Sequence, residues 1–164
     1  MAKVLFVIAK KDFRDIEYFT PKAILENAGY EIVVASNCKT GETAVGVGGG
    51  KVKINIELDE VKVGDFDAVV FVGGPGALEN LDNSESYRLA QEAVVKNKIL
   101  AAICIAPVIL AKAGVLENKK STVWDSTSDK SGIKIVIQDG KIITANGPQA
   151  AQEFGEKLLL ALRC

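Results

Sequence analysis

The sequence predicts an α/β fold, in which a mostly parallel sheet is covered by helices on both faces. The main observation is that short apolar runs, typical of buried strands, alternate with amphipathic stretches of helical length. In addition, 48% of the residues are hydrophobic, which is enough for a core on each side of a sheet. A length of 164 residues suits one domain, and we expect residues 1–164 to form it.

The first predicted elements are a buried strand and a helix. Lys3–Ala9 is almost wholly apolar, but it is too short to span a membrane. It carries one basic residue, so a strand fits better than a signal peptide. Asp15–Ala28 has the spacing of a helix, and Gly29 should end it. Pro21 should either kink this helix or mark where the helix proper begins.

Strands and turns are predicted for the next part of the chain. Tyr30–Ala35 is typical of a second strand, and Asn37–Gly50 is rich in Gly and Thr, which predicts a loop or a hairpin. Lys51–Leu58 alternates weakly between polar and apolar residues, which favours a short edge strand. Ala68–Val72 is wholly apolar and predicts a central strand that ends at Gly73.

A helix, a strand and a second helix are predicted after that turn. Ser84–Asn97 has helical spacing, with Ser84 as the expected N-cap. Ile99–Ile103 predicts another buried strand. A helix should follow over residues 107–113, because Pro favours the first helical turn and Gly follows the last.

The C-terminal part of the chain is predicted to add a short strand, a hairpin and a closing helix. Ser121–Trp124 predicts the short strand. Ile133–Ile137 and Lys141–Thr144 flank Asp139-Gly140, which is a strong hairpin-turn signal. Pro148–Leu162 predicts the helix that closes the fold.

The composition excludes several classes of function. A net charge of −1, with the two signs interspersed, gives no basic surface for nucleic acid or for an anionic membrane. We therefore expect neither as a partner, and we expect a cytoplasmic location. The chain has 3 cysteines without a CxxC pair, and it has no histidine. This excludes a disulfide framework, a zinc site and any catalytic arrangement that needs His, so we expect no metal ion.

Cys104 is the main candidate for chemistry. It follows the Ile99–Ile103 strand and precedes Pro107, so it should occupy a sharp turn from strand into helix, like a nucleophile elbow. A thiol at a helix N-terminus lies near the positive end of the dipole, which favours the thiolate. The alternative is a buried cysteine that fills a gap in the core.

Glu17 is the second candidate, near the start of the first predicted helix. One interpretation is a solvated carboxylate that complements the helix dipole. The other is a buried carboxyl group that faces Cys104. If it is protonated, such a group can donate a hydrogen bond to the thiolate and shuttle a proton.

The turn Gly73-Gly74-Pro75-Gly76 comes directly after the central strand. It lacks the spacing of dinucleotide-binding and P-loop motifs. It is either a tight turn or a place where a backbone N–H faces a developing oxyanion, with the N–H of Ile105 as the second donor.

Three further features are interpreted without a functional role. Gly46–Lys51 resembles a phosphate-binding loop, but no Ser or Thr follows Lys51, so a flexible hairpin is favoured. Cys38 and Cys164 have no partners in the sequence pattern and are interpreted as bystanders, with Cys164 on a frayed C-terminus.

Four motifs occur together in the order of a known family. They are Ala101-Ala102-Ile103-Cys104-x-x-Pro107 with Leu110-Ala111-x-Ala113-Gly114-Val115-Leu116, Asp15-Ile16-Glu17 with Pro21, Val70-Phe71-Val72-Gly73-Gly74, and Asp139-Gly140-x-Ile142-Ile143-Thr144-x-x-Gly147-Pro148. From Lys3 to about Leu162, the chain resembles the ThiJ/PfpI (DJ-one) superfamily of class I glutamine-amidotransferase-like proteins.

The resemblance implies a flavodoxin-like three-layer α/β/α sandwich with a cysteine nucleophile elbow. It implies that Cys104 is the nucleophile and that Glu17 is its hydrogen-bond partner. It also implies that the N–H groups of Gly74 and Ile105, beside Gly73, form a pocket like an oxyanion hole. It further implies a homodimer or a higher homo-oligomer.

The chain departs from the family in its lack of histidine. One branch of the family has His directly after the cysteine, where this chain has Ile105. Another branch takes a His from a later loop, which here spans about 123–132 and has none. A cysteine peptidase is therefore disfavoured. Aldehyde chemistry would use Glu17 alone as acid and base, with help from Asp125 or water.

The resemblance leaves the function open between three hypotheses. The first is a cysteine-dependent enzyme of the glyoxalase or deglycase type, a lyase or hydrolase that acts without a cofactor on small α-oxoaldehydes or their protein adducts. The second is a non-catalytic oxidative-stress sensor or chaperone in which Cys104 is oxidised. The third is a degenerate family member whose cysteine is structural.

Overall fold

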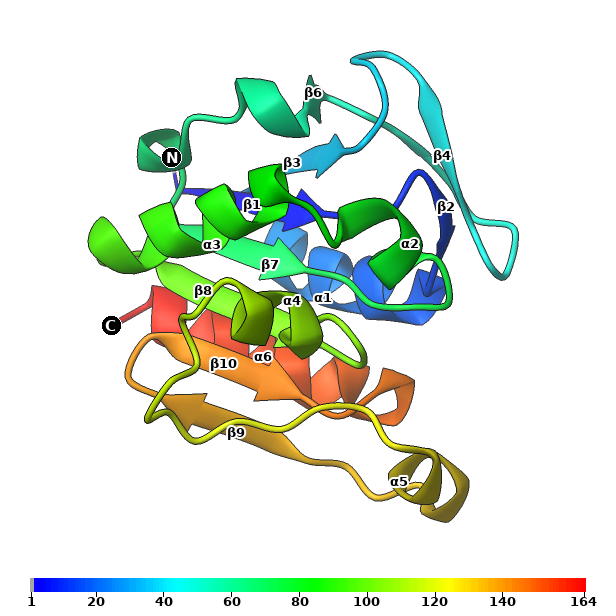
Figure 1. Ribbon diagram of the computed structural model, residues 1–164, viewed down its shortest axis with the longest axis vertical. Coiled ribbons are helices and arrows are strands. Elements are labelled where there is room, and N and C mark those ends of the chain that lie inside the picture. The colour runs from blue at the N-terminus through cyan, green and yellow to red at the C-terminus, as the bar shows by residue number, and fades with distance from the viewer. Residues whose placement is uncertain (1) are drawn as a thin grey trace.

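The structure is a computed structural model that describes residues 2–164. Its centre is a seven-stranded sheet in the order β6-β3-β1-β7-β8-β10-β9, with helices on both faces (Figure 1). β9 pairs antiparallel with β10, and the other neighbours pair parallel. The strands are β1 (Lys3–Val7), β3 (Glu31–Ser36), β6 (Ile56–Glu57), β7 (Ala68–Phe71), β8 (Ile99–Ile103), β9 (Val136–Asp139) and β10 (Ile142–Ala145). The predicted three-layer α/β fold is confirmed.

The helices form one layer on each face of this sheet. α1 and α6 pack together behind the sheet in the view of Figure 1, and α2, α3 and α4 cover the front. α5 lies apart, near the carboxyl ends of the parallel strands (Figure 1). The helices are α1 (Asp15–Asn27), α2 (Ala77–Leu81), α3 (Ser84–Val95), α4 (Pro107–Lys112), α5 (Ser126–Ser131) and α6 (Ala151–Leu162), and the 3₁₀ turns are η1 (Leu58–Glu60), η2 (Val63–Asp65) and η3 (Pro148–Ala150).

A second, three-stranded sheet corrects one prediction. It consists of β2 (Lys11–Phe13), β4 (Thr43–Gly46) and β5 (Lys51–Lys53). The predicted edge strand Lys51–Leu58 is therefore wrong as a single element, because β5 belongs to the small sheet and β6 to the edge of the large one. The chain changes sheets at Asn55, whose backbone N–H donates to the carbonyl of Val34 in β3.

Two local predictions were also wrong. Ser121–Trp124 is not a strand, because the Thr122 N–H donates to the Thr144 hydroxyl at 3.0 Å rather than to a backbone carbonyl. Ser84 is not the N-cap of α3. Instead, the side-chain oxygen of Asn83 accepts from the Ser86 N–H at 2.9 Å.

The structure of the first helix shows which of the two predictions for Pro21 fails. α1 runs unbroken through Pro21, so the helix does not begin there. Pro21 instead packs against α6, where a Cβ on Gly155 would lie 3.0 Å from the Pro21 Cα. This close approach holds the middle of α1 against α6.

The central strands β1, β7 and β8 position the candidate site. They are buried on both faces, which explains their continuous apolar runs. Because they are parallel neighbours, their carboxyl ends lie at the same edge of the sheet, on the right in Figure 1. The segments that follow them therefore meet at that edge.

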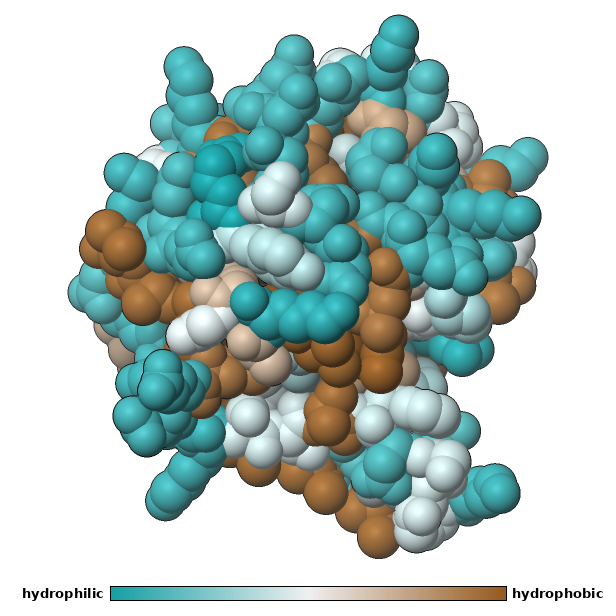
Figure 2. Space-filling model, in the orientation of Figure 1, coloured by the Kyte–Doolittle hydropathy of each residue, from teal (hydrophilic) through white to brown (hydrophobic). Residues whose placement is uncertain are grey.

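The surface in the view of Figure 1 is mostly hydrophilic (Figure 2). Hydrophobic residues are exposed at the left of Figure 2, over the end of α3 that carries Val94 and Val95. Within residues 2–164, no helix is both long enough and apolar enough to cross a membrane.

Candidate functional site

Three segments that are far apart in the sequence converge at the carboxyl edge of the sheet. They are the first turn of α1 with Glu17, the turn after β7 with Gly73 and Gly74, and the turn after β8 with Cys104. The structure thus brings together the residues that the sequence singled out.

Cys104 occupies a strained turn between β8 and α4. Its φ is +65°, a left-handed conformation that side chains other than glycine rarely adopt. The turn is held on both sides, because the Cys104 N–H donates to the carbonyl of Ala145 at 2.9 Å and its carbonyl accepts from the Trp124 N–H at 2.7 Å. The predicted sharp turn from strand into helix is therefore confirmed in its geometry.

Glu17 is fully buried, at 0% exposure. Its Oε1 accepts from the Gly73 N–H at 3.0 Å, and its Oε2 is buried without a conventional hydrogen-bond partner. The side chain within hydrogen-bonding reach of this carboxyl group is the Cys104 thiol. Of the two interpretations, the solvated carboxylate is excluded.

The glycine turn after β7 lets the backbone approach both side chains. A Cβ on Gly73 would lie 2.7 Å from the carbonyl oxygen of Ile103, 2.8 Å from the Cys104 Cβ and 2.9 Å from Glu17 Oε1. Gly74 has a φ of +110°, which favours glycine. The N–H groups of Gly74 and Ile105 hydrogen-bond to the Cys104 sulfur. Of the three backbone N–H groups nearby, those of Gly74 and Ile105 therefore face the sulfur, and that of Gly73 binds Glu17.

The pKa of Glu17 is set mainly by burial. Burial raises it from 4.5 to about 7. The hydrogen bond with Cys104 opposes this rise, as do the charge of Arg14 and the N–H of Gly73. A carboxyl group with a pKa near neutral pH can both accept and donate a proton.

The Cys104 thiol differs from the sequence prediction. Burial raises its pKa, and so do the charge of Glu17 and the hydrogen bond to it; the N–H groups of Ile105 and Gly74 lower it by less. Burial therefore disfavours the expected thiolate in the resting site. α4 begins only at Pro107, so Cys104 lies before the first turn of that helix.

The thiol opens into a cavity of about 240 Å³. Its walls combine apolar side chains with one cation and one anion. They are Arg14, Gly74, Pro75, Leu78, Cys104, Ile105, Trp124 and Asp129. Although Cys104 is only 5% exposed, a small molecule that fills this cavity therefore reaches the sulfur.

Sequence reasoning missed part of this cavity. Arg14 precedes α1 and Asp129 lies on α5, and no motif marks either residue. The sequence proposed Asp125 as an accessory, but Asp125 does not line the cavity, and its Oδ1 accepts from the Thr127 N–H at 2.8 Å. Asp125 lies just before α5, which carries Asp129, and the sequence analysis treated this whole segment as a loop.

The second glycine-rich loop is closed by a carboxylate of the protein. Asp15 accepts from the N–H groups of Gly48 and Gly50, each at 2.7 Å. The predicted hairpin is confirmed as β4 and β5. Because Asp15 fills the loop, these two N–H groups are not open to a phosphate.

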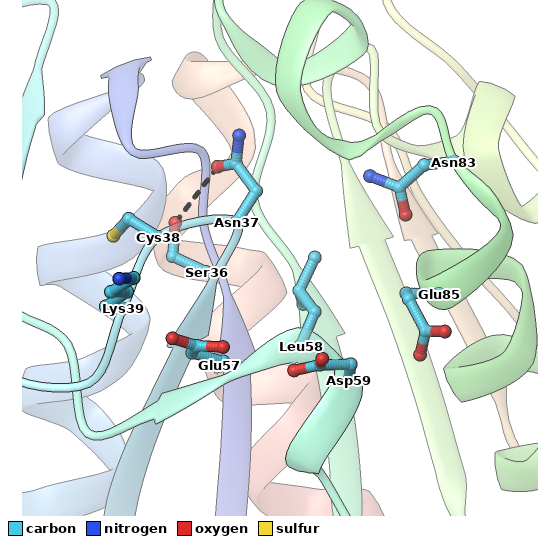
Figure 3. Close-up of a pocket in the computed structure, with 9 residues that line it drawn as sticks. All are labelled: Ser36, Asn37, Cys38, Lys39, Glu57, Leu58, Asp59, Asn83 and Glu85. Carbon is cyan, nitrogen blue, oxygen red and sulfur yellow. Dashed lines mark hydrogen bonds between the residues drawn. The ribbon is translucent and has the colours of Figure 1, made fainter.

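Another hollow, of about 330 Å³, lies between the end of β3 and the start of α3 (Figure 3). The Cys38 thiol lies on the opposite side of it from Asn83 and Glu85 (Figure 3). Burial raises the pKa of this thiol, which does not favour reactivity. Cys164 is exposed, and its thiol donates to the carbonyl of Leu160 at 3.2 Å.

Comparison with known proteins gives consistent matches over nearly the whole chain. The model of the DJ-1/PfpI family matches residues 2–161. An uncharacterized protein of Methanocaldococcus jannaschii is 41% identical, over 98% of this chain and 82% of that one. A protein of Pyrococcus furiosus named deglycase PfpI is 32% identical, over 89% and 90%. The crystal structure of a ThiJ/PfpI domain protein from Brachyspira murdochii has a TM-score of 0.87 and 34% identity, over 98% and 96%.

Proposed function

The chain belongs to the DJ-1/PfpI family, and from this premise we propose that it is a cysteine-dependent enzyme acting on small α-oxoaldehydes or their protein adducts. One observation carries the proposal. A buried carboxyl group with a pKa of about 7 contacts a thiol on a strained turn, and the thiol opens into a cavity of small-molecule size. The deglycase named among the relatives supports the substrate class.

The first step is activation of the thiol by Glu17. The ionised carboxylate takes the proton of Cys104 as the sulfur forms a bond to the aldehyde carbon. The π electrons of the carbonyl group move to its oxygen, and the N–H groups of Gly74 and Ile105 are the nearest donors for the resulting oxyanion. Glu17 then returns the proton to this oxygen, which gives a neutral hemithioacetal.

The second step is an internal oxidation and reduction. Glu17 removes the hydrogen of the former aldehyde carbon as a proton, and the neighbouring keto carbon receives a proton in return. The hydroxyl proton of the hemithioacetal passes to the keto oxygen in the same rearrangement. The first carbon is thereby oxidised to a thioester and the second is reduced to an alcohol. Water hydrolyses the thioester, which releases a 2-hydroxy acid and restores the thiol. No external oxidant, metal ion or organic cofactor enters this sequence.

The test is lactate formation from methylglyoxal. Cys104→Ser and Glu17→Gln should each reduce it to the rate of buffer, whereas Cys38→Ser, the matched control, should keep the wild-type rate. Because Glu17 must be ionised to accept the thiol proton, the wild-type kcat/KM should rise with pH through about 7. Equal rates for the wild type and Cys104→Ser would overturn the proposal.

The alternative is a sensor in which peroxide oxidises Cys104 to a sulfinate. The buried Oε2 of Glu17 favours it, because a protonated carboxyl group there would donate a hydrogen bond to a sulfinate oxygen. Intact mass after peroxide treatment tests it: two added oxygen atoms confined to Cys104 support the sensor, and oxidation spread over Cys38 and Cys164 contradicts it. A homodimer and a cytoplasmic location stay predictions.

A further inference from the structure

The guanidinium group of Arg14 is a half-buried cation without hydrogen-bond partners among the described residues. Its Nε is buried and unpaired, and no hydrogen bond or salt bridge of the side chain occurs among the described residues. Arg88 shows the contrast, because its guanidinium group bonds to Glu85, Glu92 and the carbonyl of Leu58. Buried polar groups are usually paired, so the buried Nε of Arg14 is a donor available to a partner from outside the protein.

Arg14 lies in the same part of the structure as the Cys104 thiol. Its backbone N–H donates to the carbonyl of Gly73 at 3.0 Å, which fixes it against the glycine turn. Its side chain lines the cavity of Cys104, and its charge reaches Glu17 and lowers the pKa of that group. A molecule bonded to the sulfur therefore lies in the same small cavity as the guanidinium group.

We propose that Arg14 binds a carboxylate of the substrate, so that this site takes α-oxoaldehydes that carry a carboxylate. The inference rests on the proposed function for its aldehyde chemistry. A guanidinium group presents N–H donors in a plane that matches the two oxygens of a carboxylate. Leu78, Ile105 and Trp124 add apolar surface to the cavity walls beside this pair. Neutral aldehydes offer Arg14 no anionic partner.

Two carboxylates oppose an anion in this cavity. Asp129 lines it from α5 but is exposed, so water screens its charge. Glu17 is buried, but it is ionised only in part near pH 7. Neither forms a salt bridge with Arg14 within the described part of the chain. The guanidinium group is therefore the nearest unneutralised charge for a small anion.

The first test needs no turnover, because it compares two alkylating reagents of similar size. Iodoacetate carries a carboxylate and iodoacetamide is neutral, and mass spectrometry of the Cys104 peptide gives the ratio of their rates. Arg14→Met should lower the iodoacetate-to-iodoacetamide ratio about tenfold, as expected for the loss of a charge-assisted pair. Arg14→Lys should retain part of the ratio. An unchanged ratio in Arg14→Met would overturn the inference.

Controls for this test come from the same chain. Lys11→Met removes one exposed positive charge close in sequence but outside the cavity, and it should leave the ratio unchanged. The ratios at Cys38 and Cys164 should not respond to Arg14→Met, because neither thiol lines the cavity. A parallel fall at all three cysteines would mean a general charge effect and would also overturn the inference.

The second test uses turnover of two α-oxoaldehydes. 4,5-Dioxopentanoate carries a carboxylate and methylglyoxal does not. Arg14→Met should lower kcat/KM for 4,5-dioxopentanoate about tenfold more than for methylglyoxal, both measured at one pH. Glyoxylate should inhibit reversibly through a hemithioacetal without turnover, because its second carbon is already a carboxylate.

The outcomes separate the two proposals. If neither aldehyde is turned over but the alkylation ratio responds to Arg14→Met, the proposed function fails and the anion site stands. If both are turned over and Arg14→Met affects them equally, the enzyme stands and the anion site fails.

Discussion

Two carboxylates in the first turn of α1 are held by glycine turns in different ways. Asp15 accepts two backbone N–H groups, from Gly48 and Gly50, and is partly exposed. Glu17, two residues later, accepts one N–H, from Gly73, and is fully buried. One helix turn thus anchors two loops with the same chemical group.

The difference between them separates a structural carboxylate from a reactive one. Each carboxylate oxygen of Asp15 accepts a hydrogen bond from a backbone N–H of the protein, so both oxygens have a partner. Glu17 keeps Oε2 without a conventional partner beside Cys104, and burial raises its pKa to about 7. The two roles are therefore distinguished by the number of N–H donors to each carboxylate and by the burial of each side chain. The local sequence does not distinguish them, because both residues lie in the same first turn of α1.

The largest expected effect comes from adding one methyl group at the reactive turn. Gly73→Ala would place a Cβ under 3 Å from Ile103, Cys104 and Glu17, and the Ile103 atom is backbone, which cannot move aside cheaply. We expect the free energy of unfolding to fall by about 4 kcal/mol, somewhat above ordinary overpacking. Urea denaturation measures it.

Two matched substitutions test whether this effect belongs to the reactive turn. Gly64→Ala has nothing within 4 Å of its Cβ and should be nearly neutral. Gly48→Ala would meet Asp15 Oδ2 at 3.0 Å, which is the end of a side chain and can shift. If the free energy of unfolding of Gly73→Ala were no lower than that of Gly48→Ala, the inference of close packing at Cys104 would be wrong.

The next effect is a pH dependence of stability that Glu17 alone should cause. Its pKa is 4.5 when exposed and about 7 in the folded protein, so between these values the folded state holds a proton that the unfolded state lacks. Stability from this group is complete below pH 4.5 and is lost as pH rises through about 7, by about 3 kcal/mol in total.

Glu17→Gln isolates this contribution, because the amide does not titrate. Relative to the wild type, it should gain about 3 kcal/mol between pH 4 and pH 8, measured by urea unfolding at each pH. A parallel pH dependence in the wild type and Glu17→Gln would contradict the burial of an ionisable group at this position.

The sequence predicted the elements of the fold because their signals are local. The apolar runs of β1, β7 and β8, and the turn signal at Asp139-Gly140, depend only on neighbouring residues. Ser121–Trp124 failed because its apolar and β-branched residues resemble a strand, while the bond of Thr122 to a side chain replaces the ladder. Pairing is a tertiary property that such a short segment does not encode.

The candidate site was predicted in its residues but not in its electrostatics. Cys104 and Glu17 follow from motif and position, whereas the burial that raises both pKa values depends on how α1 packs on the sheet. For the same reason, the sequence left the burial of Glu17 open and did not show that Asp15 fills the second glycine loop. Arg14 was missed because an unpaired guanidinium group is visible only once its surroundings are known.

The smallest expected effect comes from removing the structural carboxylate. Asp15→Ala deletes two charge-assisted hydrogen bonds at a partly exposed loop, so we expect a loss of about 2 kcal/mol in the free energy of unfolding. The β4–β5 hairpin should show faster amide hydrogen exchange at Gly48 and Gly50. The iodoacetamide rate of Cys104 should stay at the wild-type value, because Asp15 faces the other turn. A change in that rate would show that the two carboxylates act as one unit, and the division of roles within the first turn of α1 would have to be abandoned.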